Sequence, residues 1–436
     1  MATLSKSSFA KLVLLACGVA PLLLGAGRAE AQAAPTAQLE LSDENGLVRY
    51  ALSHNPDLRA AHWDQDVASA GVSSAAALSN PVARGEWLHV QSPNDYGFGV
   101  GLEWAPPQPG VYGAGKDAAR ARVRAVKSDF SERAAELEAN VRLGYAQVAA
   151  LEEEIALAEQ SVGTRGSVQQ AVKERMAHGA ASRIDLSLAA VSLARGEQER
   201  DLLVLSRATA VTQLEALLGL PADQPLDLKP AAPASDQVSP ANAASAATLE
   251  QRAILQRPQL RADAARADAA EQTASAERAK RWPWLELQAR YRRHDQSNYP
   301  NDVTLGLQVT LPIFNQNPGP IAAADAARHQ WQDLAAAHRL NIQRDVRALH
   351  AESERRREIA EHYAQTIAPV LSEHAALVKQ ALTGMELDLT ALLAAEDLVT
   401  RGGIEYLEAR LAQRKSQIAL ARALGQYGQT SGASAE

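Results

Sequence analysis

The stretch Tyr96-Gly97-Phe98-Gly99-Val100-Gly101-Leu102-Glu103-Trp104 alternates strictly between large apolar residues and small or polar residues. Successive side chains of a β-strand point to opposite faces, so this period of two predicts a strand with one apolar face. The same alternation recurs later in the chain, with Val303, Leu305, Leu307, Val309 and Leu311 on one face. We predict four strands, at about residues 82–92, 96–105, 284–292 and 303–311.

Short strands with one apolar and one polar face are typical of membrane β-barrels, although a soluble hairpin packed on a core alternates in the same way. Aromatic placement favours the barrel, because ten of the eighteen aromatic residues beyond position 31 lie within 81–114 and 281–315. Aromatic girdles mark the two membrane–water interfaces of such barrels. The candidates for this girdle, near the predicted strand ends, are Trp87, Trp104, Trp282, Trp284 and Phe314.

Four strands on their own leave two free edges. A free edge is not tolerated in lipid, because its backbone N–H and C=O groups find no partner there. We therefore expect the protein to oligomerise. Two copies would supply eight strands, and three copies would supply twelve and leave room for a lumen.

A long helical pattern follows each pair of predicted strands. Residues 116–176 keep apolar side chains at spacings of three and four, which predicts a helix of 61 residues. Its length would be about 92 Å at about 1.5 Å per residue. Helices of this length form coiled coils or tubes rather than compact domains. Pro369 lies inside the corresponding pattern of the second half, so we expect a kink there.

The chain consists of two copies of one unit. We place the first repeat at 43–220, a Pro/Ala-rich linker at 221–247, the second repeat at 248–425 and a flexible tail at 426–436. Each repeat has a helical stretch, an Xaa-Pro break, two strands, a long helix, a glycine turn and a return helix. The matching pairs are Pro56–Ala60 with Pro258–Ala262, Asp117–Arg120 with Asp325–Arg328, Gly179 with Gly384, and Leu218-Gly219 with Leu424-Gly425.

Residues 1–31 have the features of a signal peptide. Lys6 and Lys11 precede the apolar stretch 12–24, and Ala29-Glu30-Ala31 supplies a small-x-small cleavage site. An alternative reading makes 14–17 a lipobox, with a lipid on Cys17. That residue is the single cysteine, which excludes a disulfide framework and a cysteine-based zinc site.

The composition excludes further classes of protein. The 44 basic and 51 acidic side chains give a net charge of −7, whereas a nucleic-acid-binding protein would normally carry a basic patch. Beyond the first thirty residues, the sequence contains no run of about 18 apolar residues, so we expect no transmembrane helix in the exported protein.

Across nearly its whole exported length, the chain resembles the TolC family of outer-membrane efflux proteins. The resemblance rests on the paired repeats, on the openings Asn55–Leu58 and Arg257–Leu260, and on the turns around Gly179 and Gly384. The stretch Leu311-Pro312-Ile313-Phe314-Asn315-Gln316-Asn317-Pro318-Gly319 is similar to the outer-membrane components of heavy-metal cation efflux systems.

This resemblance implies a mainly α protein with a small β part: a homotrimer whose twelve-stranded β-barrel continues into a periplasmic α-helical tunnel. It implies location in the bacterial outer membrane, with three further partners: outer-membrane lipid, a periplasmic adaptor (membrane-fusion) protein and an inner-membrane pump of the resistance–nodulation–division type. The expected function is a passive exit duct for divalent metal cations. A duct for drugs or for type I secretion remains open, as does a periplasmic coiled-coil scaffold.

The resemblance also implies that the turns between long and return helices form the periplasmic tip that the adaptor grips. Family members often carry acidic rings six and nine residues after the second-half glycine, but this chain has Thr390 and Leu393 there. A solvated helix end is the alternative for the nearest acidic residues. We expect φ > 0 at both turn glycines. The candidate tip residues are Arg175, Gly179, Ser182, Arg183, Asp185, Gly384, Glu386 and Asp388.

Motifs for catalysis or cofactor binding are incomplete. Gly110–Lys116 fits most of a P-loop, between a predicted strand and a predicted helix, but Asp117 takes the place of the Ser/Thr that holds Mg²⁺. The sequence contains no G-x-S-x-G or H-E-x-x-H motif. We therefore expect no enzyme, no cofactor and no metal site. Four histidines recur every 12 residues, about 120° apart on a helix and so unable to share a metal: His338, His350, His362 and His374.

Overall fold

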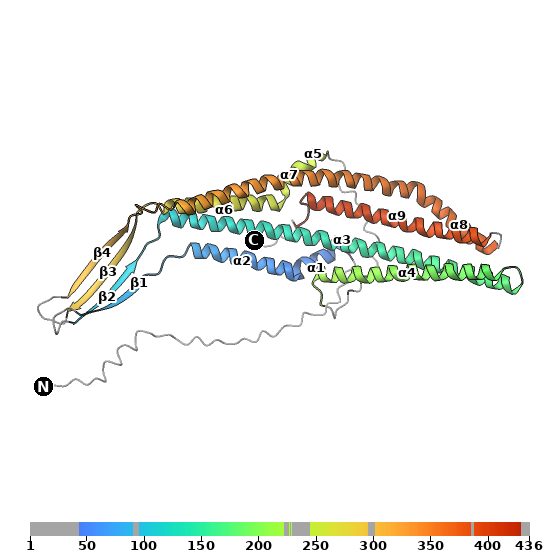
Figure 1. Cartoon of the computed structure of the whole chain (residues 1–436), viewed down its shortest axis with the longest axis horizontal. Helices are drawn as coiled ribbons and strands as arrows, with labels where there is room; N and C mark the ends of the chain where they lie inside the picture. Colours follow the sequence, from blue (N-terminus) through green and yellow to red (C-terminus); the bar gives the residue numbers. More distant parts are fainter. Residues whose placement is uncertain are drawn as a thin grey trace, which may run out of the picture. The chain divides into compact units, whose positions relative to one another are not determined.

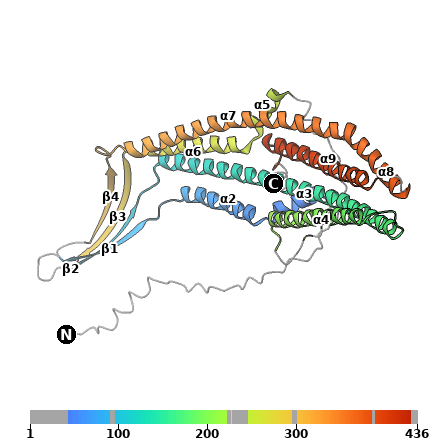
Figure 2. The same cartoon turned by 45° about the vertical axis from the view of Figure 1, so that its right-hand side comes forward.

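The computed structural model of the protein describes residues 43–89, 96–221, 226, 228, 245–294, 301–384 and 388–428. The predicted signal peptide, most of the linker and residues 429–436 of the tail lie outside these ranges. Within them the chain is mainly helical, with four antiparallel strands contributed by two repeats (Figure 1). In both views, the turn from α3 to α4, the end of α8 and the start of α9 lie at the helical end opposite the strands (Figures 1 and 2).

The two repeats have the same order of elements. The first contains α1 (Glu44–His54), α2 (Pro56–Ala75), β1 (Val82–His89), β2 (Tyr96–Trp104), α3 (Pro109–Ala177) and α4 (Arg183–Leu218). The second contains α5 (Ala246–Gln256), α6 (Pro258–Ala279), β3 (Trp284–His294), β4 (Asp302–Thr310), α7 (Pro318–His362), a π-helix (Tyr363–Ile367), α8 (Ala368–Gly384) and α9 (Leu389–Ala423). Within the described ranges, every helix falls short of the sustained apolar length that a membrane-spanning helix needs.

The strands form one sheet in the order β1-β2-β3-β4, with every neighbouring pair antiparallel. Their bounds differ slightly from those expected. β3 runs to His294 rather than 292, β4 lies one residue earlier, β2 ends at Trp104, and residues 90–92 lie outside the described ranges.

The long helix of the first repeat begins at Pro109, seven residues before the predicted start, and has 69 residues. The glycine-rich stretch 110–115 is therefore helical, which corrects its interpretation as a loop between strand and helix. Proline at the first helical position presets φ, and the Gln108 side chain donates to the Ala279 carbonyl at 2.7 Å. A Cβ on Gly110 would lie 2.9 Å from that of Ala279, so glycine allows α3 to start against the end of α6.

Alanine dominates the interface between α3 and α6, the two most extensively paired helices. Small side chains let helix backbones approach closely, which explains how a chain with only 4% aromatic residues packs its long helices. The buried alanines of the two helices are Ala118, Ala119, Ala121, Ala125, Ala134, Ala135, Ala139, Ala158, Ala262, Ala265, Ala269, Ala270, Ala274 and Ala276.

The long helix of the second repeat is interrupted where the sequence contains Pro369. A π-helix spans Tyr363–Ile367, immediately before α8. Proline has no N–H to donate and its ring displaces the carbonyl four residues earlier, so the preceding turn widens.

The return helices of the two repeats, α4 and α9, end in the same way. Gly219 and Gly425 adopt φ of 72° and 70°, and each closes its helix with the hydrogen-bond pattern of a Schellman motif. An added Cβ on Gly219 would lie 2.8 Å from Pro56 Cδ, and one on Gly425 would lie 3.2 Å from the Gln256 carbonyl carbon. The glycine and the Xaa-Pro break therefore recur together because they pack against each other.

We expect Gly219→Ala to destabilise the protein, because the left-handed conformation costs a non-glycine residue about 1–2 kcal/mol and the added methyl meets backbone. Gly71→Ala is the matched control. It lies in α2 with no atom within 4 Å of an added Cβ, so it should stabilise by about 0.5–1 kcal/mol. Thermal unfolding of the detergent-purified proteins measures both changes. Equal stability of the two variants would contradict the packing argument.

Candidate functional site: the helical turns and the sheet

The turn between α3 and α4 is closed by backbone and side-chain hydrogen bonds at both helix ends. Gly179 has φ of 74°, as predicted, and the Ala180 and Gly179 amides donate to the Arg175 and Met176 carbonyls at 2.8 and 3.0 Å. These bonds are those of a Schellman motif. The turn is therefore held in one conformation by its own backbone.

Ser182 and Asp185 form a capping box at the start of α4. The Ser182 amide donates to the Asp185 carboxylate at 2.8 Å, and the Asp185 amide donates to the Ser182 hydroxyl at 3.1 Å. These hydrogen bonds to Ser182, with a smaller contribution from Arg175, lower the pKa of Asp185. Both residues thus have a structural role, and Arg183 beside them adds an exposed guanidinium.

The second turn differs from the first. Gly384 is the last residue of α8 and still helical, so the expected glycine turn is wrong at this position. Residues 385–387, and with them Glu386, lie outside the described ranges. Asp388 caps the start of α9 without a side-chain hydrogen bond to the helix.

A buried ion pair joins α3 to α9, and its two residues carry no signal in the sequence that predicts the pair. Glu396 of α9 accepts a hydrogen bond from Arg165 Nε of α3 at 2.6 Å, and both side chains are at most 6% exposed. Ser161 and Thr400 donate to the other carboxylate oxygen of Glu396, and the Ser192 carbonyl of α4 accepts from Arg165 at 3.1 Å. Three helices from the two repeats therefore meet at one satisfied charge pair.

The register of the strands gives the sheet one apolar and one polar face. Directly paired residues share a face. Leu102 of β2 thus lies in line with Ala289 of β3 and Leu305 of β4. The apolar face consists of Ala83, Gly85, Trp87, Phe98, Val100, Leu102, Trp104, Leu285, Leu287, Ala289, Tyr291, Arg293, Val303, Leu305, Leu307 and Val309.

The opposite face of the sheet is strongly polar and carries three cross-strand ion pairs. Arg84 pairs with Glu103 at 2.9 Å, Arg290 with Glu86 at 3.3 Å, and Arg292 with Asp302 at 3.6 Å. Gln288 also donates to Gln308 at 3.0 Å. The alternation read from the sequence therefore becomes two chemically different surfaces.

The candidate girdle residues lie in two places. Trp87 packs against Phe98 on the apolar face, with ring centroids 5.5 Å apart. Where the strands meet the helices, the Trp104 indole donates to the Ser79 carbonyl at 3.0 Å, and the Trp284 indole donates to the Pro106 carbonyl. Trp282 and Phe314 are exposed at the same junction.

The metal-efflux-like stretch 311–319 forms the corner between β4 and α7. Asn317 has φ of 61°, its amide donates to the Asn315 side chain at 2.9 Å, and Pro318 then begins α7. Asparagine tolerates a left-handed conformation better than most residues. Asn315, Asn317 and Pro318 therefore have a conformational role in this stretch.

Among the described residues, no further strand pairs with either edge of the sheet. Each inner strand has two neighbours, whereas β1 pairs only with β2, and β4 only with β3. Each edge thus presents backbone groups that could pair with another strand.

The family model described as "Outer membrane efflux protein" matches residues 47–220 and 249–426. The chain belongs to the outer membrane efflux protein family. It is an efflux channel of the outer membrane with a periplasmic helical extension, of the kind found in tripartite systems, and not an enzyme.

Relatives of this efflux protein agree in fold. It is 26% identical over 327 residues to the cobalt-zinc-cadmium resistance protein CzcC of Cupriavidus metallidurans, covering 72% of this chain and 68% of that protein. The Neisseria gonorrhoeae MtrE outer membrane channel in its open state is similar in structure, with a TM-score of 0.73, 19% identity and coverage of 88% and 89%. The Campylobacter jejuni CmeC outer membrane channel is also similar in structure, with a TM-score of 0.72 and 15% identity. The match covers 88% of this chain and 85% of that channel.

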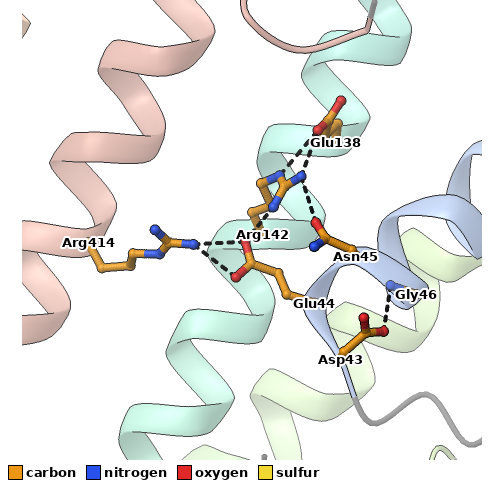
Figure 3. A network of polar contacts seen from close by, with 7 residues as sticks. All are labelled: Asp43, Glu44, Asn45, Gly46, Glu138, Arg142 and Arg414. Carbon is orange, nitrogen blue, oxygen red and sulfur yellow. Dashed lines mark hydrogen bonds and ion pairs between the residues drawn. The ribbon is translucent and has the colours of Figure 1, made fainter. Parts of the chain in front are cut away.

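A second charge network joins α1, α3 and α9 of this efflux protein (Figure 3). Glu44 of α1 accepts hydrogen bonds from Arg142 of α3 at 2.8 Å and from Arg414 of α9 at 2.9 Å. Arg142 also donates to Glu138, whose other oxygen accepts from the Gly428 amide at 3.0 Å. Burial alone would lower the pKa of Arg142, but the hydrogen bonds to the two glutamates raise it.

Tyr427 covers this network, with its ring 5.3 Å from the Arg142 guanidinium carbon. Burial raises the pKa of Tyr427 to about 12, although Arg142 and Arg414 act in the opposite direction. The phenol therefore stays neutral, and the network's charge resides on the glutamates and arginines.

The first of the four evenly spaced histidines has an acidic partner. His338 hydrogen-bonds through Nδ1 to the buried Asp263 at 2.7 Å, joining α7 to α6. Among the described residues, no group of three or more His, Cys, Asp or Glu side chains is arranged to hold a metal ion.

We expect Arg165→Ala to destabilise the protein by about 3–5 kcal/mol, because it leaves the buried Glu396 carboxylate without its charged partner. Arg401→Ala is the matched control. Arg401 pairs with Asp397, one helical turn earlier in α9, and the arginine side chain is 70% exposed. Loss of this ion pair should lower the free energy of unfolding by at most about 0.5 kcal/mol. Thermal and denaturant unfolding compare the two. A similar, small loss in both would show that Glu396 is adequately solvated without Arg165.

Proposed function

We propose that three copies of this chain close a twelve-stranded barrel and form the exit duct for divalent metal cations in a tripartite efflux system. The unpaired edges of β1 and β4 carry this proposal. Lipid offers no hydrogen-bond partner to an exposed strand edge, so β1 of one copy must pair with β4 of the next. Twelve strands give room for a water-filled lumen, whereas eight would be filled by side chains.

The two faces of the sheet support this closure. Apolar side chains would face lipid, with Trp87, Trp104, Trp282 and Phe314 in the interfacial girdles. The fifth girdle candidate, Trp284, lies on the polar face by its pairing with Thr310, so it would face the lumen instead. The polar face, with its ion pairs, would line the lumen. In this arrangement the helices lie in the periplasm, and the strand ends at His89, Tyr96, His294 and Asp302 lie toward the outside.

The proposal of metal cations rests on two observations. The corner 311–319 is similar to heavy-metal efflux components, and the chain has 26% identity to a protein named for cobalt, zinc and cadmium resistance. The described residues contain no dedicated metal site. We therefore place the choice of substrate in the pump and the adaptor, with this chain as a passive duct.

We further propose that the helical turns dock the periplasmic adaptor. The tight turn at Gly179, fixed by Ser182 and Asp185, presents the guanidinium groups of Arg175 and Arg183. We assign the second part of the docking surface to Gly384, Glu386 and Asp388.

Arg183→Glu tests the docking proposal. An acidic residue in the first turn of α4 favours the helix dipole, so the fold should be retained or slightly stabilised, by about 0.3–1 kcal/mol. We expect normal heat-resistant trimers but impaired efflux and weaker cross-linking to the adaptor. The control, Arg195→Glu, makes the same charge change at an exposed position of the same helix and should support efflux. Full efflux by Arg183→Glu would contradict docking through this arginine.

A strain that lacks the gene tests the substrate. We expect it to become sensitive to cobalt, zinc, cadmium, nickel or copper, and to recover when the gene is restored. Growth on those metals and on a panel of drugs gives the readout. Sensitivity to drugs alone would refute metal export while leaving the duct intact, whereas a soluble monomeric protein would refute the duct itself.

A further inference from the structure

Charged side chains lie flat across the polar face of β2. This strand contributes only glycine at three successive positions of that face: Gly97, Gly99 and Gly101. Gly99 is buried although the strands pack extensively only against one another. The atoms that cover it come from β1 and β3, because an added Cβ would lie 3.0 Å from Glu86 Cγ and 3.2 Å from Arg292 Cγ.

One ion pair spans this glycine strand completely. Arg290 lies on β3 and Glu86 on β1, which are not neighbours, yet their charged atoms are 3.3 Å apart. Two strand spacings separate the two backbones by about 9–10 Å. The side chains can bridge that distance only by lying along the sheet, and β2 leaves the space for them.

The exposures of these side chains agree with this geometry. Glu86 and Arg290 are 41% and 39% exposed, and Arg292 is 32% exposed, on a face that none of the described helices covers extensively. A long charged side chain standing away from the sheet would be mostly exposed. The four residues Glu86, Arg290, Arg292 and Asp302 therefore form a flat charged layer, held by ion pairs at two levels of the barrel.

We propose that this flat charged layer sets the bore of the barrel, and that Gly99 and Gly101 keep the lumen wide at their level. The inference rests on the proposed function, since the polar face lines a lumen only when three copies close. A side chain at position 99 would lift Glu86 and Arg292 off the sheet. Symmetry would repeat this displacement three times at one level, so the lumen would narrow from all sides.

Access of a reagent from outside the cell tests the proposal. Gln288 lies on the polar face, in line with Glu103 and closer to the helices than either glycine level. In a Gln288→Cys parent, we would compare a small maleimide with a maleimide carrying a polyethylene-glycol chain. The test variant adds Gly99→Leu. The control adds Gly85→Leu, on the opposite face of β1, where an added Cβ has no atom within 4 Å.

We expect both reagents to modify the parent and the control. In the Gly99→Leu protein, the small reagent should still react, while modification by the polymer is lost. Gly101→Leu is a second variant with the same expected loss, and its added Cβ would make only ordinary contacts, at 3.6–4.0 Å. Heat-resistant trimers in the outer membrane show that each variant has assembled.

Unchanged polymer modification in an assembled Gly99→Leu or Gly101→Leu trimer would overturn the inference. Polymer loss in the Gly85→Leu control as well would also overturn it, because the effect would then not depend on the polar face. Failure of the small reagent to react with the parent would overturn the proposed function, and this inference with it.

Discussion

The structure depends on one constraint: every backbone N–H and C=O group of a strand in lipid needs a hydrogen-bond partner. The four strands satisfy one another at three interfaces and leave the outer edges of β1 and β4 open. A helix can satisfy its own backbone, but a four-stranded sheet cannot. The requirement for further copies of the chain therefore follows from the sheet order, and the duct is a property of the assembly rather than of the single chain.

The helical part solves a different problem, which is to hold two repeats together with few large side chains. Alanine-rich faces let α3 and α6 approach closely, and Gly219 and Gly425 seat each return helix on an Xaa-Pro corner. Charge pairs then join the repeats, because Glu396 and Arg414 of α9 reach Arg165 of α3 and Glu44 of α1 respectively. Removal of one partner from the buried Arg165–Glu396 pair would leave the other charge uncompensated, so this pair opposes any other packing of α3 and α9.

Features with a short period or a direct repeat could be predicted from the sequence. The alternation in 96–104 gave the strand and its faces, and the repeat gave the order of elements. The long helix begins earlier than predicted, because its glycine-rich first turns lack the apolar periodicity that marks the rest of the helix. Gly110 is present because its position lies against Ala279 of α6, and this contact cannot be read from periodicity. The Arg165–Glu396 pair joins residues 231 positions apart, so the sequence shows two ordinary charged helix residues. At the second turn, the alignment of Gly384 with Gly179 predicted a left-handed glycine. Gly384 is instead the last helical residue of α8, so the aligned glycines do not share a conformation.

Closure of the barrel requires β1 of one copy to pair with β4 of the next. Cysteine cross-linking tests it most directly, because Cys17 is the single cysteine and lies within the predicted signal peptide. Single cysteines placed along β1 would be combined with single cysteines along β4, and the oxidised outer membranes examined on denaturing gels. The account predicts covalent dimers and trimers at one register of positions and none at the others. Monomers at every register would contradict it.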